Sequence, residues 1–145
     1  MYLLELAGED DAFAAREAAS AATDVSVVAP GLATARGISE RVRGLAYTHR
    51  ASELLGRTDS ALASARALLE ATTFERTGAV AVRARDARGL TGIDTQAVER
   101  ELGQVLVDRG FTVDLDDPDH VLQAVFSRGD DEGTCALGWL AVESV

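Results

Sequence analysis

Residues 80–103 read VAVRARDARGLTGIDTQAVERELG and contain the change of pattern that decides the fold. The apolar set Val80, Val82 and Ala84 alternates with the set Ala81, Arg83 and Arg85. Such alternation predicts a β-strand that buries the first set and exposes the arginines. Arg88 and two glycines then indicate a loop, and a helix follows it.

The helix is predicted to begin at Asp94, whose carboxylate can cap the first turn. Ile93 and Val98 occupy the two positions of a hydrophobic staple around this start. The predicted buried face consists of Val98, Leu102, Val105 and Leu106. Arg109 lies in the last turn, and Gly110 favours termination of the helix.

The segments around this strand and helix predict further elements of an α/β pattern. Thr58 and Asp59 can cap a helix over DSALASARALLEAT, residues 59–72. The β-rich runs HVLQAVFS, residues 120–127, and TCALGWLAV, residues 134–142, predict two paired strands. The segment RGDDEG at 128–133 is typical of a turn between them.

Residues 1–56 predict a β-α-β-β-α-β order, which is the ferredoxin-like pattern. The predicted strands are 2–7, 25–30, 31–37 and 47–56, the last ending on Gly56, and the first helix lies within 8–22. Ser39 can cap a short second helix over ERVRGLA, residues 40–46. The fold class is therefore α/β (α+β), with a ferredoxin-like domain over 1–56 and a second domain with a helix-flanked mixed sheet over 57–145.

Composition indicates a soluble, acidic protein. The 145 residues carry a formal net charge of −10, from 24 acids and 14 basic residues that are all arginine. A GC-rich genome would explain the missing lysine but not the acid surplus, so a halophilic archaeal host is favoured. No signal peptide or membrane-spanning run is apparent, and a cytoplasmic location is expected.

Charge is segregated along the chain. Residues 76–88 contain four arginines and one acid, and residues 36–57 contain five arginines and two acids, whereas 110–145 contain one arginine and eight acids. Arginine suits bidentate phosphate contacts, and the helix start at 94–96 offers backbone N–H donors to an anion. The alternative is that these arginines pair with surface carboxylates.

Motifs for catalysis and metal binding are missing from the sequence. It has no phosphate loop ending in Gly-Lys, no G-x-S-x-G elbow and no methyltransferase Asn/Asp-Pro-Pro motif, so no catalytic residue is assigned. The segment DLDDPDH at 114–120 departs from a calcium loop and favours a solvated turn, so no metal site is expected. Cys135, His49 and Trp139 are most simply structural residues.

The run from Val80 to Ser127 resembles the core of a THUMP domain. The matching positions are Val98–Gly103, Val113–Leu115 and Pro118–Asp119, and residues 1–56 resemble the ferredoxin-like domain that precedes THUMP. The overall likeness is to the N-terminal part of archaeal tRNA guanosine N2-methyltransferases. The resemblance implies that the chain binds tRNA at the acceptor end and its CCA tail.

The resemblance also implies a separate C-terminal domain that methylates guanine with S-adenosylmethionine and is expected beyond Val145. No cofactor is expected in this chain, and its partners would be tRNA and that methyltransferase domain. Alternatives are a module of a tRNA thiolation or deamination enzyme, or a small interaction protein without RNA. The candidate RNA contacts are Arg83, Arg85, Arg88, Thr95, Gln96, Arg100, Arg41 and Arg43.

Overall fold

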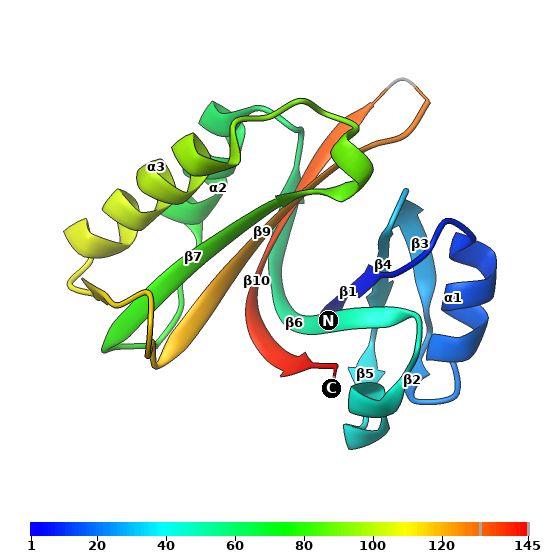
Figure 1. Cartoon of the computed structure of the whole chain (residues 1–145). Helices are drawn as coiled ribbons and strands as arrows, with labels where there is room; N and C mark the ends of the chain where they lie inside the picture. Colours follow the sequence, from blue (N-terminus) through cyan, green and yellow to red (C-terminus); the bar gives the residue numbers. More distant parts are fainter. Residues whose placement is uncertain (131, 145) are drawn as a thin grey trace.

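The computed structural model of the chain describes residues 1–130 and 132–144 (Figure 1). The strands are β1 (Tyr2–Leu6), β2 (Ala22–Thr23), β3 (Ser26–Ala29), β4 (Leu32–Ala35), β5 (Gly37–Ile38), β6 (Thr48–Thr58), β7 (Ala79–Asp86), β8 (Thr112–Val113), β9 (His120–Arg128) and β10 (Gly133–Glu143). The α-helices are α1 (Asp11–Ala18), α2 (Leu62–Ala71) and α3 (Thr95–Asp108), and the 3₁₀ helices are η1 (Glu40–Gly44) and η2 (Ala87–Gly89).

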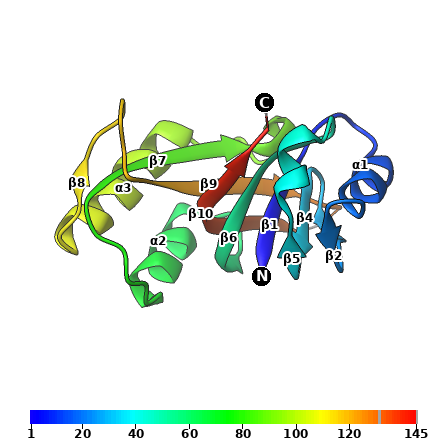
Figure 2. The ribbon, with the colours of Figure 1, turned by 90° about the horizontal axis from the view of Figure 1, so that it is seen from below.

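Eight strands form one mixed sheet in the order β3-β4-β1-β6-β10-β9-β7-β8. β7 runs parallel to β8 and β9, and the other neighbouring pairs are antiparallel. α1 lies at one end of the sheet and the α2–α3 pair at the other (Figure 2). The predicted α+β class with a helix-flanked mixed sheet is confirmed.

The N-terminal strands have the order and directions of a ferredoxin-like sheet, β3-β4-β1-β6, all antiparallel. Ser39 caps the following helix as predicted, because its Oγ accepts a hydrogen bond from the Arg41 backbone N–H. That helix is the five-residue 3₁₀ helix η1 rather than an α-helix. Between the cap and Gly44 there is room for little more than one turn, a length typical of 3₁₀ helices.

Three groups of buried side chains form the hydrophobic core on the two faces of the sheet. α1 packs on one face through Ala14 and Ala18, and α2 and α3 cover their part of the sheet through residues such as Leu69 and Leu102. A third group joins strands from both ends of the sheet: Leu3, Leu32, Val125 and Ala136. Because β1 and β4 pack on β9 and β10 here without being their neighbours, the sheet curls over this face.

The curl is produced by β6 and β10, which bend in the middle of the sheet (Figure 1). Their pairing shifts register between Leu137 and Gly138 and again between Leu140 and Val142. At Gly138 a Cβ atom would lie 2.8 Å from the Glu53 carbonyl oxygen, so glycine permits the close approach of the two strands.

The C-terminal elements follow their predictions closely. The α3 cap at Asp94 and the four predicted buried residues of α3 are confirmed. The helix predicted from Asp59 begins instead at Leu62. Asp59 accepts a hydrogen bond from the N–H of Ala61, which directly precedes the helix, and another from the hydroxyl of Ser64 in its first turn. The predicted turn at 128–133 includes Asp131, which lies outside the described residues, as does Val145.

β6 does not end on Gly56 but runs on to Thr58, because it pairs with β10 as far as Cys135. The predicted domain boundary after residue 56 thus falls inside a strand that the sheet shares, and it stays a prediction. Within the described parts of the chain, no helix has the length and apolar character needed to cross a membrane.

Candidate nucleic-acid interface

The loop after β7 carries Arg88 and is fixed by its own side chains. Asp86 accepts hydrogen bonds from the backbone N–H groups of Thr91, at 3.0 Å, and Gly92, at 2.9 Å. Arg88 has a φ of 56°, in the left-handed region, which costs a non-glycine residue roughly 1–2 kcal/mol. The loop therefore presents Arg88 from an unfavourable backbone conformation that its surroundings maintain.

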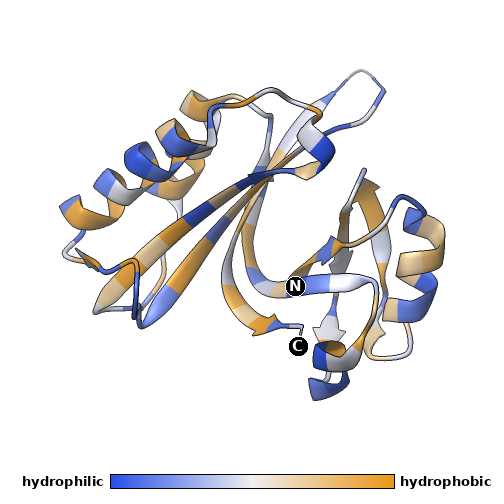
Figure 3. Cartoon of the chain, viewed as in Figure 1, coloured by the Kyte–Doolittle hydropathy of each residue, from blue (hydrophilic) through white to orange (hydrophobic). Residues whose placement is uncertain are grey.

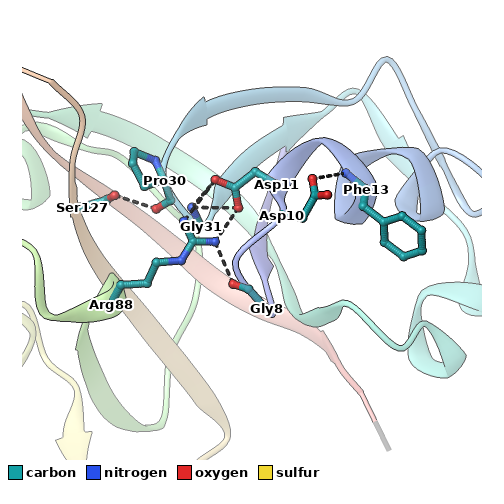
Figure 4. Close-up of polar contacts among 8 residues, drawn as sticks. All are labelled: Gly8, Asp10, Asp11, Phe13, Pro30, Gly31, Arg88 and Ser127. Atoms are coloured by element: carbon teal, nitrogen blue, oxygen red, sulfur yellow. Dashed lines mark hydrogen bonds and ion pairs between the residues drawn. The ribbon is translucent and has the colours of Figure 1, made fainter.

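The Arg88 side chain contacts α1 and is not free in solvent (Figure 4). Its Nη2 atom lies 2.7 Å from Asp11 Oδ1 and its Nη1 atom 3.3 Å from Asp11 Oδ2, and Nη2 also donates to the Gly8 carbonyl at 2.8 Å. Asp11 in turn accepts from the Gly31 N–H at 3.2 Å. The guanidinium thus connects η2 to α1 and to the turn between β3 and β4.

Arg85 lies in a second charged group, on the inner face of the curled sheet. Its Nη1 atom donates to the Gln123 side-chain oxygen and lies 4.0 Å from Glu5 Oε1. Arg50 contacts the same Glu5 oxygen at 3.4 Å and donates to Glu143 at 2.9 Å. Two arginines from different strands therefore share one buried carboxylate.

Burial dominates the electrostatics of this group. Only 7% of the Glu5 side chain is exposed, and burial raises the pKa of Glu5 above 4.5, although Arg85 and Arg50 oppose the shift. Burial also lowers the pKa of Arg85, with Glu5 opposing it. Glu5 Oε2 has no hydrogen-bond partner among the described residues. Arginine nevertheless stays protonated at neutral pH.

A cavity of about 440 Å³ opens beside these two groups and is called the seam cavity here. Its polar lining includes Glu5, His49, Arg50, Arg85, Asp86 and Arg88. Three of these residues are arginines, but Arg50, Arg85 and Arg88 all already contact carboxylates of the fold. An anion would enter by competing with those carboxylates.

The arginines of β7 are less exposed than the sequence predicted. Arg83 and Arg85 are half-buried and Ala81 is fully buried, because this face of β7 lines the inside of the curl rather than the solvent side. Arg83 donates to the Leu115 carbonyl at 2.9 Å. In Figure 3 this part of β7 appears as hydrophilic bands that follow an apolar beginning of the strand.

Two backbone donors at the start of α3 are already occupied. The N–H groups of Gln96 and Ala97 donate to Asp94 Oδ1 at 3.1 and 3.2 Å, so the capping carboxylate occupies them. Gln96 is exposed and Thr95 is half-buried.

Arg41, Arg43 and Arg100 are exposed, and none of the three has an ion pair or side-chain hydrogen bond within the described residues. Arg100 is on α3, whereas Arg41 and Arg43 are on η1, at the opposite end of the molecule (Figure 1). The eight candidate residues therefore do not form one patch.

Sequence reasoning missed Glu5 and Asp11, the acids that engage the arginines. The signal for Glu5 was present, since alternation along β1 puts it on the same face as the buried Leu3. Asp11 gave no such signal, because it lies in the first turn of α1, where acids are common for local reasons. Its contact with Arg88 depends on how the sheet curls.

Cys135 and Trp139 are buried in the core, as expected. His49, which was expected to be a structural residue, is instead exposed beside the seam cavity, and its side chain makes no hydrogen bond within the described residues. In the acidic segment, Asp114 accepts from two backbone N–H groups of its own turn and Asp119 from the Ala79 N–H. Among the described residues, no group of three or more His, Cys, Asp or Glu side chains is arranged to hold a metal ion.

No protein-family model and no curated protein sequence matches the chain. Several solved structures match its fold over nearly the whole length. TrmN from Thermus thermophilus is 23% identical with a TM-score of 0.65, a predicted N6-adenine-specific DNA methylase from Listeria monocytogenes is 14% identical with a TM-score of 0.61, and a 4-thiouridine synthetase solved as an RNA complex with bound ATP is 12% identical with a TM-score of 0.55.

The alignments cover 99%, 94% and 97% of this chain, but only 46%, 40% and 41% of those three chains. The chain is thus similar to a part, less than half, of each of these larger proteins. At these identities the likeness establishes the fold alone.

Proposed function

We propose that the chain is a THUMP-type RNA-binding module that docks the acceptor and CCA end of tRNA. It would position the tRNA for a guanosine N2-methyltransferase domain. The observation that supports this most is the match of nearly the whole chain to part of TrmN and of a synthetase solved in complex with RNA. The THUMP-like sequence pattern at Val98–Gly103 supports the same assignment independently.

In this proposal the module contributes binding and orientation. Phosphate contacts fix the register of an RNA without reading its sequence, and exposed arginines are suited to them. Arg41, Arg43 and Arg100 are available at no cost to the fold, because none of their side chains has an ion pair or hydrogen bond within residues 1–130 and 132–144. Arg83, Arg85 and Arg88 would each exchange an oxygen acceptor of the protein for a phosphate oxygen.

The chemistry would lie in the other domain. S-adenosylmethionine would supply the methyl group there, and we assign no residue of this chain to it. The same module could instead serve a thiolation enzyme, which the likeness to the 4-thiouridine synthetase favours. The domain to which the module is joined distinguishes the two.

A role without RNA is favoured by one observation. Two of the three arginines in and after β7 contact carboxylates, Arg88 with Asp11 and Arg85 with Glu5. If these pairs only hold the fold together, the arginine concentration needs no ligand.

The test is binding of labelled tRNA, with and without its 3′-CCA end, across a salt series. The proteins are the wild type, Arg83→Ala/Arg85→Ala, and a control Arg36→Ala/Arg66→Ala that removes the same charge from exposed surface pairs. We expect CCA-dependent binding by the wild type and the control, and a loss of at least about tenfold in the first variant. Absence of tRNA binding by the wild type at every salt concentration would refute the proposed function.

A further inference from the structure

An apolar groove lies between α3 and the edge strand β8, at the end of the sheet opposite α1 (Figure 2). It has a volume of about 310 Å³, and its apolar lining includes Val80, Val82, Val107, Val113 and Leu115. The last three are exposed, and they are three of the eight large apolar side chains that are exposed among the described residues. Single exposed apolar side chains are normal on a surface, but a group of them around one groove indicates a contact surface.

The exposed row of α3 beside this groove carries one charge of each sign. Arg100, Gln104 and Asp108 follow one another at intervals of four residues, so their side chains lie on one face of the helix. Arg100 and Gln104 also line the groove. Within the described residues Arg100 has no ion pair or side-chain hydrogen bond, and Asp108 accepts only from the Gln104 amide, at 2.9 Å. Both charges are therefore free to pair with another molecule.

This row of α3 is complementary to itself in a two-fold arrangement. If two copies of α3 pack antiparallel about Gln104, Arg100 of each copy lies opposite Asp108 of the other, so symmetry makes the same ion pair twice. A parallel arrangement in register would place like charges opposite each other, so the charges select the antiparallel one. Gly103, beside Gln104, has no atom within 4 Å of an added Cβ, which leaves room for a second backbone to approach.

We infer that α3 and the groove form a homodimer interface, whose occupant is a second copy of this chain. In this contact Arg100 pairs with Asp108 of the other copy, and Val107 and Leu115 of each copy cover the apolar groove of the other. One helix of 14 residues, about 21 Å long, and one loop from each copy give an interface near the lower end of the size range. The dimer is therefore weak, and its population depends on protein concentration.

The charges around the groove argue against RNA as its occupant. Glu99 lines the groove, and the exposed Asp114, Asp116 and Asp117 lie in the segment that forms its other wall. These acids repel a polyanion, whereas a second copy brings Arg100 toward them. The inference is thus independent of the proposed RNA-binding function. In the dimer Arg100 is withdrawn from the candidate RNA contacts, while the arginines of η1 stay free at the opposite end of the molecule (Figure 1).

The experiment measures molar mass by sedimentation equilibrium over a range of protein concentrations. The buffer contains about 1 M KCl, which screens most of the repulsion between two copies of net charge −10. Arg100→Asp and Asp108→Arg each place like charges opposite each other, twice in every homodimer. An equimolar mixture of the two variants restores opposite charges in the mixed dimer, because one copy then carries only aspartates at the two positions and the other only arginines.

Two further variants complete the experiment. Arg43→Asp makes the same charge change as Arg100→Asp at an exposed residue of η1, and Leu115→Ser removes an apolar side chain from the groove. All four substituted residues are exposed, so the fold should be retained, and melting temperatures check this.

We expect the wild type and Arg43→Asp to dimerise with a dissociation constant of about 1–100 μM. Arg100→Asp, Asp108→Arg and Leu115→Ser should each dimerise at least about tenfold more weakly, and the mixture of the two charge variants should recover an affinity close to that of the wild type. A wild type that stays monomeric at every concentration overturns the inference, as does a dimer that the folded charge variants retain. Charge variants that fail to associate when mixed also overturn it. None of these results changes tRNA binding through η1, so they leave the proposed function intact.

Discussion

Arg88 and Asp11 are 77 positions apart in the sequence, and two hydrogen bonds of 2.7 and 3.3 Å join their side chains. This bidentate pair ties η2 to α1, from opposite ends of the curled sheet, and Ser127 adds a bond to the Pro30 carbonyl nearby (Figure 4). An arginine predicted to bind phosphate is therefore already held by a carboxylate of similar geometry. Any phosphate contact at Arg88 would loosen this connection.

The Arg88–Asp11 pair is predicted to contribute measurable stability. Its side chains are only 29% and 20% exposed, so a double-mutant cycle with Arg88→Ala and Asp11→Ala should give a coupling energy of about 1–2 kcal/mol in urea unfolding. The matched control is Arg36 with Asp24, whose charged atoms lie 2.8 Å apart but whose side chains are 79% and 62% exposed, so the coupling energy should be below about 1 kcal/mol. Equal coupling energies in the two cycles would show that the Arg88–Asp11 pair stabilises the fold no more than an exposed ion pair does.

Glu5 predicts a pH dependence of stability with a definite sign. Its folded pKa is raised above 4.5, so the folded state binds a proton more tightly than the unfolded state. The contribution of Glu5 to stability is therefore greatest below pH 4.5 and decreases as pH rises through the raised pKa. Glu5→Gln removes this dependence.

The measurement for Glu5 is the free energy of unfolding of wild type and Glu5→Gln, from urea titrations between pH 4 and pH 8. The difference between variant and wild type should move in favour of the variant as pH rises through the window above 4.5. A difference that is flat in this range, or that moves toward the wild type, would mean that Arg50 and Arg85 outweigh burial at Glu5.

The sequence predicted elements well and long-range contacts poorly. The cap at Asp94 and the buried face of α3 depend on neighbours within a few residues, and the structure has both. The prediction that Arg83 and Arg85 are exposed was wrong, because alternation identifies the two faces of a strand but does not show what covers the second face. Here the curl of β6 and β10 covers it, and that curl depends on register shifts such as the one at Gly138, which leave no periodic signal.

The bend at Gly138 should be intolerant of a side chain. A Cβ atom there would lie 2.8 Å from the Glu53 carbonyl oxygen and 2.9 Å from Ser52 Cβ, so Gly138→Ala should lower the free energy of unfolding by about 1–3 kcal/mol. Gly103, in the middle of α3, has no atom within 4 Å of an added Cβ, so Gly103→Ala should raise it by roughly 0.5–1 kcal/mol. A Gly138→Ala protein as stable as wild type would argue against the close approach of β6 and β10.

The acid surplus predicts that salt stabilises the fold. With a net charge of −10, the like charges of the folded protein repel one another. The distance over which salt screens this repulsion falls from about 10 Å at 0.1 M to about 3 Å at 1 M. The melting temperature should therefore rise from 0.1 to 1 M KCl, as we propose for a salt-adapted host. A steady fall over this range would mean that ion pairs such as Arg66–Glu101 matter more than the self-repulsion.

Cys135 should report on opening of the whole core. The thiol is fully buried in β10, and burial raises its pKa to about 12, so almost no thiolate forms in the native state at pH 8. A thiol reagent should therefore label the native protein only through unfolding, at a rate that increases with urea, whereas the fully unfolded chain should react at once with one thiol per molecule. Because Cys135 packs in the same core as Val98 and Leu102, core variants in α3 should accelerate labelling in proportion to their loss of stability. Rapid labelling of the native protein, insensitive to such variants, would mean that β10 opens locally while the rest of the sheet stays closed.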